Sequence, residues 1–387
     1  MFSSILGALY LQDLVVTLLL VLVQILGAFL ILRGPARDSS PAVRRRITFT
    51  VLLSVVALGL AHLLLYEGLA RHFSRFWTVW GRSAVLLWGI LSIFWLTAYG
   101  LTVSPSSNHS PARRGFLRAA QVALFGAPAA AAGYGMFIQR FGLSLREQRI
   151  VLPNLPEALH GLRLVQLTDI HLSPLLSERE LAQAVAMANE TRAHVALVTG
   201  DLISGHGDPL DACIAHLSGL KVDSGIYGCL GNHERYADAE DYTQTRGAQF
   251  GLHFLRHQAV KLNFAGATMN LIGVDYQRFN RPYLTGAESL MDPAAFNVLL
   301  SHNPDVFPVA ARKGFPLTIS GHTHGGQVRV EILEHDLNVA RFYTPYVDGL
   351  YRRGDSSVFV SRGIGTIGLP ARVGAPPEVA LITLCRT

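Results

Sequence analysis

Four long stretches without charged side chains lie in the first third of the chain. They cover residues 14–32, 47–66, 83–103 and 119–138. Each matches the length of about 20 residues that a helix needs to cross the apolar core of a bilayer. The pattern predicts an N-terminal bundle of about four transmembrane helices within residues 1–142. The last stretch is rich in alanine and glycine and carries Pro128, so a signal-like segment or a buried helix is the alternative there.

The hydrophobic pattern changes at about Leu143, where short apolar runs begin to alternate with amphipathic segments. Apolar runs of strand length cover residues 162–169, 193–201, 225–234, 268–276, 297–305, 316–324, 357–365 and 379–384. Amphipathic periodicity predicts helices at 177–192 and 208–220. The alternation predicts a parallel or mixed α/β sheet, and the strand-rich second half predicts a second sheet packed on the first. Residues 143–387 are enough for one large globular domain.

The two predicted helices carry signals at their starts. Ser177 and Glu180 have the spacing of a capping box. Asp208 is the expected N-cap of the second helix, with Pro209 in its first turn. These signals place both helices directly after predicted strands, as in an α/β fold.

Composition supports the membrane interpretation. The 387 residues are 50% hydrophobic and only 16% charged, which is more apolar than an ordinary soluble protein of this length. The net charge of +6 comes mostly from arginine, and much of it lies beside the apolar stretches. We therefore do not expect nucleic acid as a partner. Cys213, Cys229 and Cys385 fit no paired metal spacing and are expected in the core.

Arginines predict the orientation of the helices. The loop between the first two stretches holds Arg33, Arg37, Arg44, Arg45 and Arg46, and the segment before the fourth holds Arg113, Arg114 and Arg118. Basic loops face the cytoplasm, so the C-terminal domain is expected outside it, on the periplasmic side of a bacterial inner membrane. Arg71, Arg75 and Arg82 in the remaining loop, opposed by Glu67, give a weaker bias the other way.

Two adjacent arginines, Arg113 and Arg114, also stand before an apolar stretch in "ARRGFLRAA". This segment resembles the twin-arginine export signal, which would make the export machinery a partner. Ordinary cytoplasmic flanking charge is the alternative. Either interpretation places the C-terminal domain outside the cytoplasm.

Side chains suited to metal binding follow the predicted strands. In chain order they are Asp169 and His171, Asp201, Asn232 and His233, His302, then His322 and His324. The carboxyl ends of strands are where α/β sheets build their sites. Oxygen and nitrogen ligands suit Mn, Fe, Zn, Ni or Co. On an extended backbone, residues two apart point to the same side, so each Asp-x-His or His-x-His pair would aim two ligands at one place.

Glycines stand beside these side chains, and the donors are numerous. Gly200, Gly231 and Gly321 permit tight turns and close backbone approach. One metal could use three or four of these side chains, so their number allows two divalent ions that share one carboxylate. A pair of ions about 3.5–4 Å apart can activate water and neutralise a phosphoryl oxygen during in-line attack.

The ordered set D-x-H, G-D, G-N-H-E, a later H and G-H-x-H resembles the calcineurin-like metallophosphoesterases over roughly residues 160–384. The resemblance implies a four-layer α-β-β-α sandwich with two metals at one edge. It implies a first metal held by Asp169, His171, Asp201 and His324. It implies a second metal held by the shared Asp201 with Asn232, His302 and His322. His233 would be a catalytic residue that protonates the leaving oxygen or stabilises the phosphoryl group, acting beside Asn232 and Asp201.

One motif departs from a branch of that family. Protein serine/threonine phosphatases follow the second motif with Asp-Arg-Gly, whereas this chain reads "GDLISGHGD". The anionic substrate would then meet Arg235, Arg362 or Arg372, because an arginine fork suits phosphate oxygens. For each of them a surface or structural role is the alternative.

The C-terminal run 346–384 resembles the membrane-associated bacterial branch of the family, which includes exported phosphoesterases and UDP-2,3-diacylglucosamine pyrophosphatases. The predicted function is a membrane-anchored two-metal phosphoesterase that hydrolyses a phosphodiester or pyrophosphate bond, with a lipid-linked substrate suggested by the membrane helices. A periplasmic phosphodiesterase acting on soluble nucleotides and a non-catalytic metal-binding scaffold are the alternatives. A transporter is disfavoured because His62 is the only ionisable side chain within the predicted spans.

Overall fold

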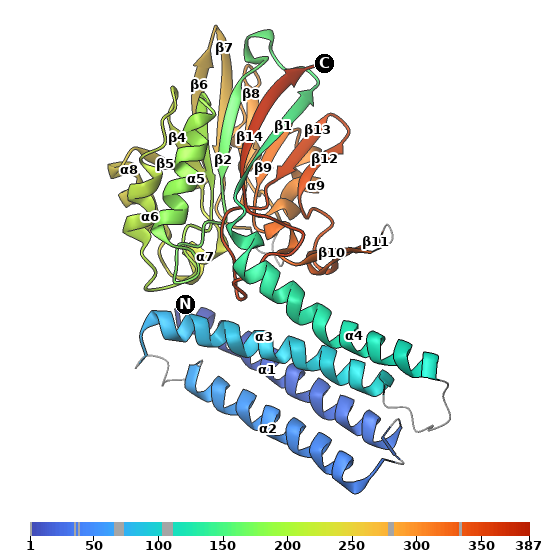
Figure 1. Cartoon of the computed structure of the whole chain (residues 1–387). Coiled ribbons are helices and arrows are strands. Elements are labelled where there is room, and N and C mark those ends of the chain that lie inside the picture. The colour runs from blue at the N-terminus through green and yellow to red at the C-terminus, as the bar shows by residue number, and fades with distance from the viewer. Residues whose placement is uncertain are drawn as a thin grey trace. The chain divides into compact units, whose positions relative to one another are not determined.

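The chain forms two compact units in the computed structural model (Figure 1). One contains Met1–Met136 with Gly368–Pro370, and the other contains Phe137–Ile367 with Ala371–Thr387. The structure describes residues 2–34, 36–37, 39–65, 73–102, 111–277, 282–332 and 335–387. Each unit is considered by itself below.

The first unit is helical. Its helices are α1 (Phe2–Arg33), α2 (Pro41–Leu65), α3 (Arg75–Thr102) and α4 (Pro111–Phe137). Within the described residues, three segments are long and apolar enough to cross a membrane: Leu14–Arg33, Arg75–Leu96 and Val122–Phe141. They overlap the predicted stretches 14–32, 83–103 and 119–138, and the second begins and ends several residues earlier than predicted. The stretch 47–66 is helical in α2 as far as Leu65 but is not among the candidates, so the count of four spans is not confirmed.

Some sequence predictions for this unit fall beyond what the structure describes. Tyr66, Glu67, Arg71 and Val103 lie outside the described residues. The backbone of Arg113, Arg114 and Arg118 is in α4, but their side chains are not described. The orientation of the helices and the export signal therefore stay predictions.

The second unit is a mixed α/β sandwich built on two six-stranded sheets. The first sheet has the order β1-β14-β2-β3-β4-β5. These strands are β1 (Ser144–Leu152), β14 (Glu378–Arg386), β2 (Arg163–Leu167), β3 (Val195–Thr199), β4 (Ile226–Cys229) and β5 (Leu252–Phe254). Strands β2 to β5 are parallel, and β14 runs antiparallel to β2 but parallel to β1.

The second sheet has the order β12-β13-β9-β8-β7-β6. These strands are β12 (Gly349–Arg353), β13 (Ser356–Val360), β9 (Leu317–Ser320), β8 (Phe296–Leu300), β7 (Ala267–Gly273) and β6 (Gln258–Phe264). The four central strands are parallel, and the edge strands β12 and β6 are antiparallel to their neighbours. A separate hairpin pairs β10 (Arg329–Ile332) with β11 (His335–Asn338).

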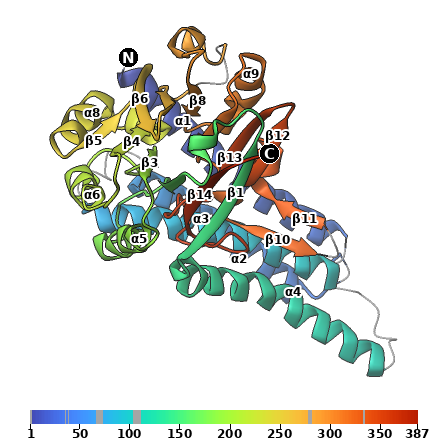
Figure 2. The same cartoon turned by 90° about the horizontal axis from the view of Figure 1, so that it is seen from above.

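Helices α5 (Glu178–Glu190), α6 (Leu210–Leu217), α8 (Glu240–Gln249) and α9 (Phe307–Arg312) cover the outer faces of the two sheets, and α7 (Asn232–Tyr236) follows the end of β4. Short 3₁₀ turns complete the chain: η2 (Gln139–Phe141), η3 (Glu157–Leu159), η4 (Ala287–Leu290), η5 (Pro304–Val306), η6 (His324–Gly326) and η7 (Val339–Phe342). Figure 2 shows α5, α6 and α8 on one side of the strands and α9 on the other.

Apolar cores fill the spaces between these layers. One core joins α5 and α6 to the outer face of the first sheet, through residues such as Leu181, Ile214 and Val198. A second lies between the sheets, where Leu197 and Leu300 are fully buried. Two smaller clusters pack the outer face of the second sheet under α9. Because strands such as β3 are buried on both faces, they read as continuous apolar runs in the sequence.

The predicted helices are present, with one error at a helix start. Ser177 Oγ accepts from the Glu180 backbone N–H, and Glu180 accepts from the Ser177 backbone N–H, so the capping box is confirmed. Asp208 does not cap α6, because the N-cap is Pro209. The Asp208 carboxylate instead accepts from the backbone N–H groups of Ser204 and Gly205. It stabilises the turn before the helix rather than the helix itself.

Every predicted strand is present, but several further strands were missed. The missed ones include β1, β6 and β12, which lie at sheet edges. Their exposed sides carry polar residues, as the sequence SLREQRIVL of β1 and its mostly exposed burial pattern show. An edge strand needs fewer apolar side chains than a central one, so a search for apolar runs passes over it.

Candidate metal centre

The predicted ligands all follow parallel strands directly, three loops from the first sheet and two from the second. Asp169 and His171 follow β2, Asp201 follows β3, and Asn232 and His233 begin α7 after β4. From the second sheet, His302 follows β8, and His322 and His324 follow β9. The carboxyl ends of parallel strands meet at one edge of a sheet. Both sheets therefore contribute side chains to one place.

One cluster combines Asp169, His171 and His324, whose potential ligand atoms all lie within 4.8 Å of one another. His324 Nε2 is 3.4 Å from Asp169 Oδ1. The two imidazoles face each other, with 3.1 Å between His171 Nε2 and His324 Nε2. All three residues are buried. Two ring nitrogens and a carboxylate oxygen thus point into the same small space.

A second cluster combines Asp201, His302 and His322 within the same 4.8 Å limit. Asp201 Oδ2 is 3.0 Å from His302 Nε2 and 3.5 Å from His171 Nε2. The Asp201 carboxylate therefore lies between the two clusters. This is the place that a carboxylate shared by two ions would take.

Among the predicted metal ligands, two buried polar atoms have no hydrogen-bond partner within the described part of the chain. They are Nε2 of His302 and Oδ1 of Asn232. When the His302 ring is neutral, Nδ1–H donates to the Thr199 carbonyl at 2.7 Å, which leaves the lone pair on Nε2. Buried polar atoms are normally satisfied, so these two are suited to hold a metal ion. The donor set of carboxylate, amide and imidazole groups fits a divalent transition metal.

The electrostatics of the clusters favour a cation at their centre. Burial, helped by the neighbouring His233, lowers the pKa of His171 to about 3, and burial with His302 lowers the pKa of His322 to about 3. Both imidazoles are then neutral, which is the form that binds metals. Burial acts to lower the pKa of His302, but the carboxylates of Asp201 and Asp169 outweigh it and raise that pKa to about 10. The buried carboxylates attract positive charge.

The backbone at these residues is not extended, which corrects the geometric reasoning from the sequence. Five of the seven predicted metal ligands have positive φ: Asp169 (50°), His171 (51°), Asp201 (54°), His322 (77°) and His324 (53°). Each such residue costs of order 1–3 kcal/mol and persists only where its surroundings fix it. One such contact is the His322 backbone N–H, which donates to both Asp169 oxygens at 3.0 Å. The paired ligands converge through left-handed turns.

Two glycines allow the loops to approach each other. A Cβ on Gly231 would lie 2.1 Å from Asp201 Oδ1, and a Cβ on Gly321 would lie 2.3 Å from Asp169 Oδ2. Neither position leaves space for a side chain, because the neighbouring atoms are the carboxylates of the site. Both glycines therefore permit the close backbone approach that the sequence predicted.

Glu234 is a positioning residue for which the sequence analysis had no role, although it is the last letter of G-N-H-E. It is fully buried. Its carboxylate accepts from the backbone N–H groups of Gly231 at 2.8 Å, Asp201 at 3.0 Å and Leu202 at 2.6 Å. It thus fixes the loop after β3 against the loop after β4. Its place two residues after Asn232 in G-N-H-E is the sequence signal that could have suggested this role.

We expect Glu234→Gln to weaken both stability and metal binding. The amide replaces one acceptor oxygen with a donor that faces backbone N–H groups, so the unfolding free energy should fall by ~1–3 kcal/mol. The displaced loops should lower metal affinity roughly 10–100-fold. Thermal unfolding and a metal titration measure the two effects. Glu190→Gln, at an exposed position in α5, is the matched control, and equal behaviour of both variants would contradict the role.

His233 is placed differently from the other histidines. Its backbone N–H donates to Asp201 Oδ1 at 2.9 Å, and its Nδ1–H donates to the Ser204 carbonyl at 2.7 Å. Its ring lies 4.6 Å from the His171 ring and also forms a cluster with His171 and Asp201. The side chain is only partly buried, whereas His171 and Asp201 are buried. His233 is therefore within reach of a substrate, with Nε2 free of the Ser204 contact.

The three predicted phosphate-binding arginines differ from one another. Arg362 Nε donates to Glu378 Oε2 at 2.6 Å, so its guanidinium is already paired with a buried carboxylate. Arg235 lies in α7 beside His233, and its Nε is buried without a hydrogen-bond partner in the described part of the chain. Of the three, Arg235 is the one whose position still fits substrate binding.

Arg372 is completely buried. Burial, partly offset by Asp169, lowers its pKa to about 10. Its guanidinium donates to five backbone carbonyls, those of His324, Arg362, Gly363, Gly365 and Ala375. The contacts hold the loop of His324 against the loop after β13. This geometry favours the structural alternative for Arg372, because no substrate oxygen reaches a guanidinium that the backbone encloses.

Tyr276 is a further side chain near the site that the sequence did not single out. Its ring lies 5.6 Å from the His322 ring and 6.4 Å from the His302 ring. Burial raises the pKa of its phenol above the ordinary value, so the hydroxyl stays protonated. It forms an aromatic wall beside the second cluster. The sequence carries no separate signal for this role, because Tyr276 ends an apolar run and an aromatic residue is also common in a strand.

We expect His324→Ala and His322→Ala to affect different ions. His324 belongs to the cluster with Asp169 and His171, and His322 to the cluster with Asp201 and His302. Each single variant should therefore lose about one ion per chain, and the double variant should lose both. Metal analysis of the purified proteins measures this, with the exposed His206→Ala as control. Two ions retained in either single variant would remove that histidine from the ligand set.

Comparisons with known proteins agree with this geometry. Residues 162–326 match the family model of calcineurin-like phosphoesterases. An uncharacterized metallophosphoesterase of Bacillus subtilis (strain 168) is 28% identical over 295 residues, covering 71% of this chain and 98% of that protein. Proteins named "Transmembrane protein with metallophosphoesterase domain" are 30% identical over 247 residues in Bos taurus and 31% over 250 residues in Danio rerio. The matches cover 59% and 61% of this chain, and 54% and 56% of the lengths of those two relatives.

Proposed function

The chain carries a calcineurin-like phosphoesterase domain over residues 162–326, and on that premise we propose that it is a membrane-anchored, two-metal phosphoesterase. The reaction is hydrolysis of a phosphodiester or pyrophosphate bond. The observation that supports it is the pair of clusters on either side of Asp201, each with ligand atoms within 4.8 Å. Asp169, His171, Asp201 and His324 would hold one divalent ion, and Asp201, Asn232, His302 and His322 the other.

Bound at this site, two divalent ions would supply an activated water and neutralise charge on the phosphoryl oxygens. The residues of the chain hold these groups in place before the substrate arrives. Thr199 fixes the His302 ring through the bond to Nδ1, and Thr168 Oγ1–H donates to Asp169 Oδ2 at 2.9 Å. Such contacts orient ligands and keep reorganisation small during the reaction.

His233 would move the proton. With Nδ1–H donating to the Ser204 carbonyl, Nε2 of the protonated imidazole can donate to the leaving oxygen as the P–O bond breaks. The attacking water forms the new P–O bond, and its proton restores the imidazolium. The partly exposed side chain of Arg235, in the same helix, would contact a non-bridging phosphoryl oxygen.

The reaction class is tested with the purified full-length protein. We expect hydrolysis of bis-nitrophenyl phosphate in the presence of Mn, Fe, Zn, Ni or Co, and loss of that hydrolysis after chelation. Restored activity on adding one metal back identifies the ion. Full metal loading without hydrolysis of any phosphodiester or pyrophosphate would instead favour the alternative of a non-catalytic scaffold.

The substrate is proposed to be lipid-linked, such as a UDP-diacylglucosamine-like pyrophosphate. The support is the set of apolar helices on the same chain, in which the described residues include three segments long enough to cross a membrane. The second candidate is a soluble nucleotide, for which the helices serve only as an anchor. Rates of the full-length protein on a lipid pyrophosphate in mixed micelles and on a soluble dinucleotide separate the two. A preference for the soluble substrate would overturn the lipid assignment.

The catalytic domain is proposed to lie on the extracytoplasmic side of a bacterial inner membrane. The support is the arginine distribution around the apolar helices, and the twin-arginine machinery is a candidate partner through Arg113 and Arg114. A periplasm-dependent reporter fused after Thr387 tests the orientation. Activity of a cytoplasm-dependent reporter at the same position would reverse it.

A further inference from the structure

The helical unit contains a cavity of ≈ 380 Å³ lined by residues of α1, α2 and α3. This volume falls within the range of about 300–1,000 Å³ that small-molecule sites occupy. Much of the wall is apolar and aromatic, with Ile47 and Val51 from α2 and Trp88 and Trp95 from α3. The two indole rings meet edge to face with centroids 5.8 Å apart. Thr50 lines the cavity and is exposed, so the cavity opens beside α2.

Polar side chains that line the cavity form a chain of hydrogen bonds that ends at the Gly89 carbonyl, which accepts from Ser92 Oγ–H at 2.8 Å. Gln24 Nε2–H donates to Ser92 Oγ at 2.6 Å, and Ser54 Oγ–H donates to Gln24 Oε1 at 2.7 Å. Trp88 Nε1–H donates to Ser54 Oγ at 2.8 Å. These bonds join all three helices and give partners to the buried side chains of Gln24, Ser54 and Ser92. An occupant therefore needs no polar group at this depth, which suits an aliphatic chain.

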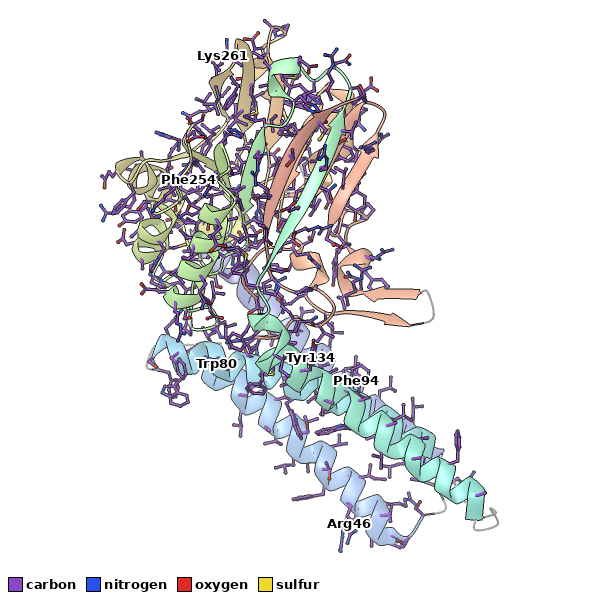
Figure 3. The ribbon with its side chains drawn as sticks, turned by 45° about the horizontal axis from the view of Figure 1, so that its top comes forward. Arg46, Trp80, Phe94, Tyr134, Phe254 and Lys261 are labelled. Carbon is purple, nitrogen blue, oxygen red and sulfur yellow. The ribbon has the colours of Figure 1, made fainter. Side chains whose placement is uncertain are left out.

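Arg46 also lines the cavity, and its side chain is exposed near the first turn of α2 (Figure 3). The acidic residues of 1–136 are Asp13, Asp38 and Glu67, and the side chains described in this part of the chain include no carboxylate. Arg46 follows Arg44 and Arg45 directly. The cavity thus joins an apolar interior to a strongly positive rim.

The charge pattern also argues against filling the cavity with another helix of this chain. The sequence of α4 has no acidic residue and carries Arg113, Arg114 and Arg118. A second copy would bring the same excess of arginine. Both would bring a net excess of positive charge toward Arg46, whereas a lipid phosphate brings negative charge, and basic residues at a membrane surface attract anionic lipids.

We propose that this cavity binds one acyl chain of an anionic phospholipid, with the lipid phosphate against Arg46. The apolar side chains hold the acyl chain, and the guanidinium supplies a charge-assisted hydrogen bond to the phosphate. The inference takes the membrane location from the proposed function, but it does not depend on catalysis. It gives the helices a lipid-binding role in addition to anchoring.

The test uses the full-length protein purified from membranes in a mild detergent and then incubated with deuterated phosphatidylglycerol or phosphatidylcholine of the same chains. Native mass spectrometry measures the retained lipid. We expect one phosphatidylglycerol per chain and much less phosphatidylcholine. Arg46→Gln should lower phosphatidylglycerol retention about fivefold. Thr50→Trp, which fills the cavity from its exposed side, should abolish retention of both lipids.

Arg45→Gln is the matched control, because it removes the same charge from the neighbouring residue, which does not line the cavity. Equal lipid retention by Arg45→Gln and Arg46→Gln would overturn the phosphate contact. No retained lipid in the unmodified protein, or a dimer that Thr50→Trp dissociates, would overturn the lipid as occupant. Lipid retention is independent of hydrolysis, so an inactive protein that still binds phosphatidylglycerol would contradict only the proposed function.

Discussion

Asp201→Asn is expected to leave less than one metal ion per chain and to lower kcat/KM by roughly 10³-fold or more. The physical reason is the position of this carboxylate. Its Oδ2 lies 3.0 Å from His302 Nε2 and 3.5 Å from His171 Nε2, between the two clusters. An amide oxygen carries no net charge and bridges two cations poorly, so both ions lose their shared ligand. Metal analysis and steady-state kinetics measure the two effects.

Asp211→Asn is the control for this substitution. This substitution makes the same chemical change at an exposed position, where the Asp211 carboxylate accepts from Tyr242 and Arg246. It should keep full metal content and activity. The structure also gives Asp201 a second contact, because its Oδ1 accepts from the His233 backbone N–H, which an amide oxygen can still do. Normal metal content together with normal activity in Asp201→Asn would contradict the shared-ligand role.

His233→Ala is expected to lower kcat by roughly 10²- to 10⁴-fold, the usual contribution of a positioned general acid, while both metal ions stay bound. The loss should depend on the leaving group. An aryl phosphate with an acidic phenol leaves without a proton and should lose little rate, whereas an alkyl or lipid phosphate should lose nearly all of it. A series of substrates with different leaving-group pKa values measures this dependence alongside metal content.

His216→Ala is the control, because His216 is partly exposed, contacts Glu178 and belongs to none of the ligand clusters of the described residues. An equal loss of rate for all leaving groups in His233→Ala would assign the residue to phosphoryl binding. Loss of a metal ion would instead make His233 a ligand in the cluster with His171 and Asp201. Either result would contradict proton transfer by this imidazole.

Much of the α/β unit was predictable because its central strands are buried on both faces. Strands such as β3 and β8 have no exposed position, so packing requires apolar side chains throughout and the sequence shows them. The edge strand β1 carries Arg146, Glu147 and Arg149, and only its pairing with β14 makes it a strand. A long-range pairing of that kind leaves no local signal. The Asp208 capping prediction was wrong for a related reason, since a preceding turn took its carboxylate.

The candidate site was likewise predictable only in part. Each predicted ligand follows an apolar strand, so its position could be inferred from the strand pattern alone. The roles of Glu234 and Arg372 could not, because both act by accepting from or donating to backbone groups of distant loops. Arg362 was a predicted substrate contact, but the sequence could not show that its guanidinium already pairs with the buried Glu378.

The sequence by itself determined the kinds of donor atoms, their order along the chain and their places after buried strands, because these follow from local chemistry and periodicity. Only the tertiary structure decided how the donors converge. His171 and His324 are 153 residues apart, yet their Nε2 atoms are 3.1 Å apart, because two sheets pack with the carboxyl ends of their parallel strands at one edge. The left-handed turns at Asp169, Asp201 and His322 are likewise unfavourable locally. They persist because glycine contacts and buried hydrogen bonds from other loops hold them.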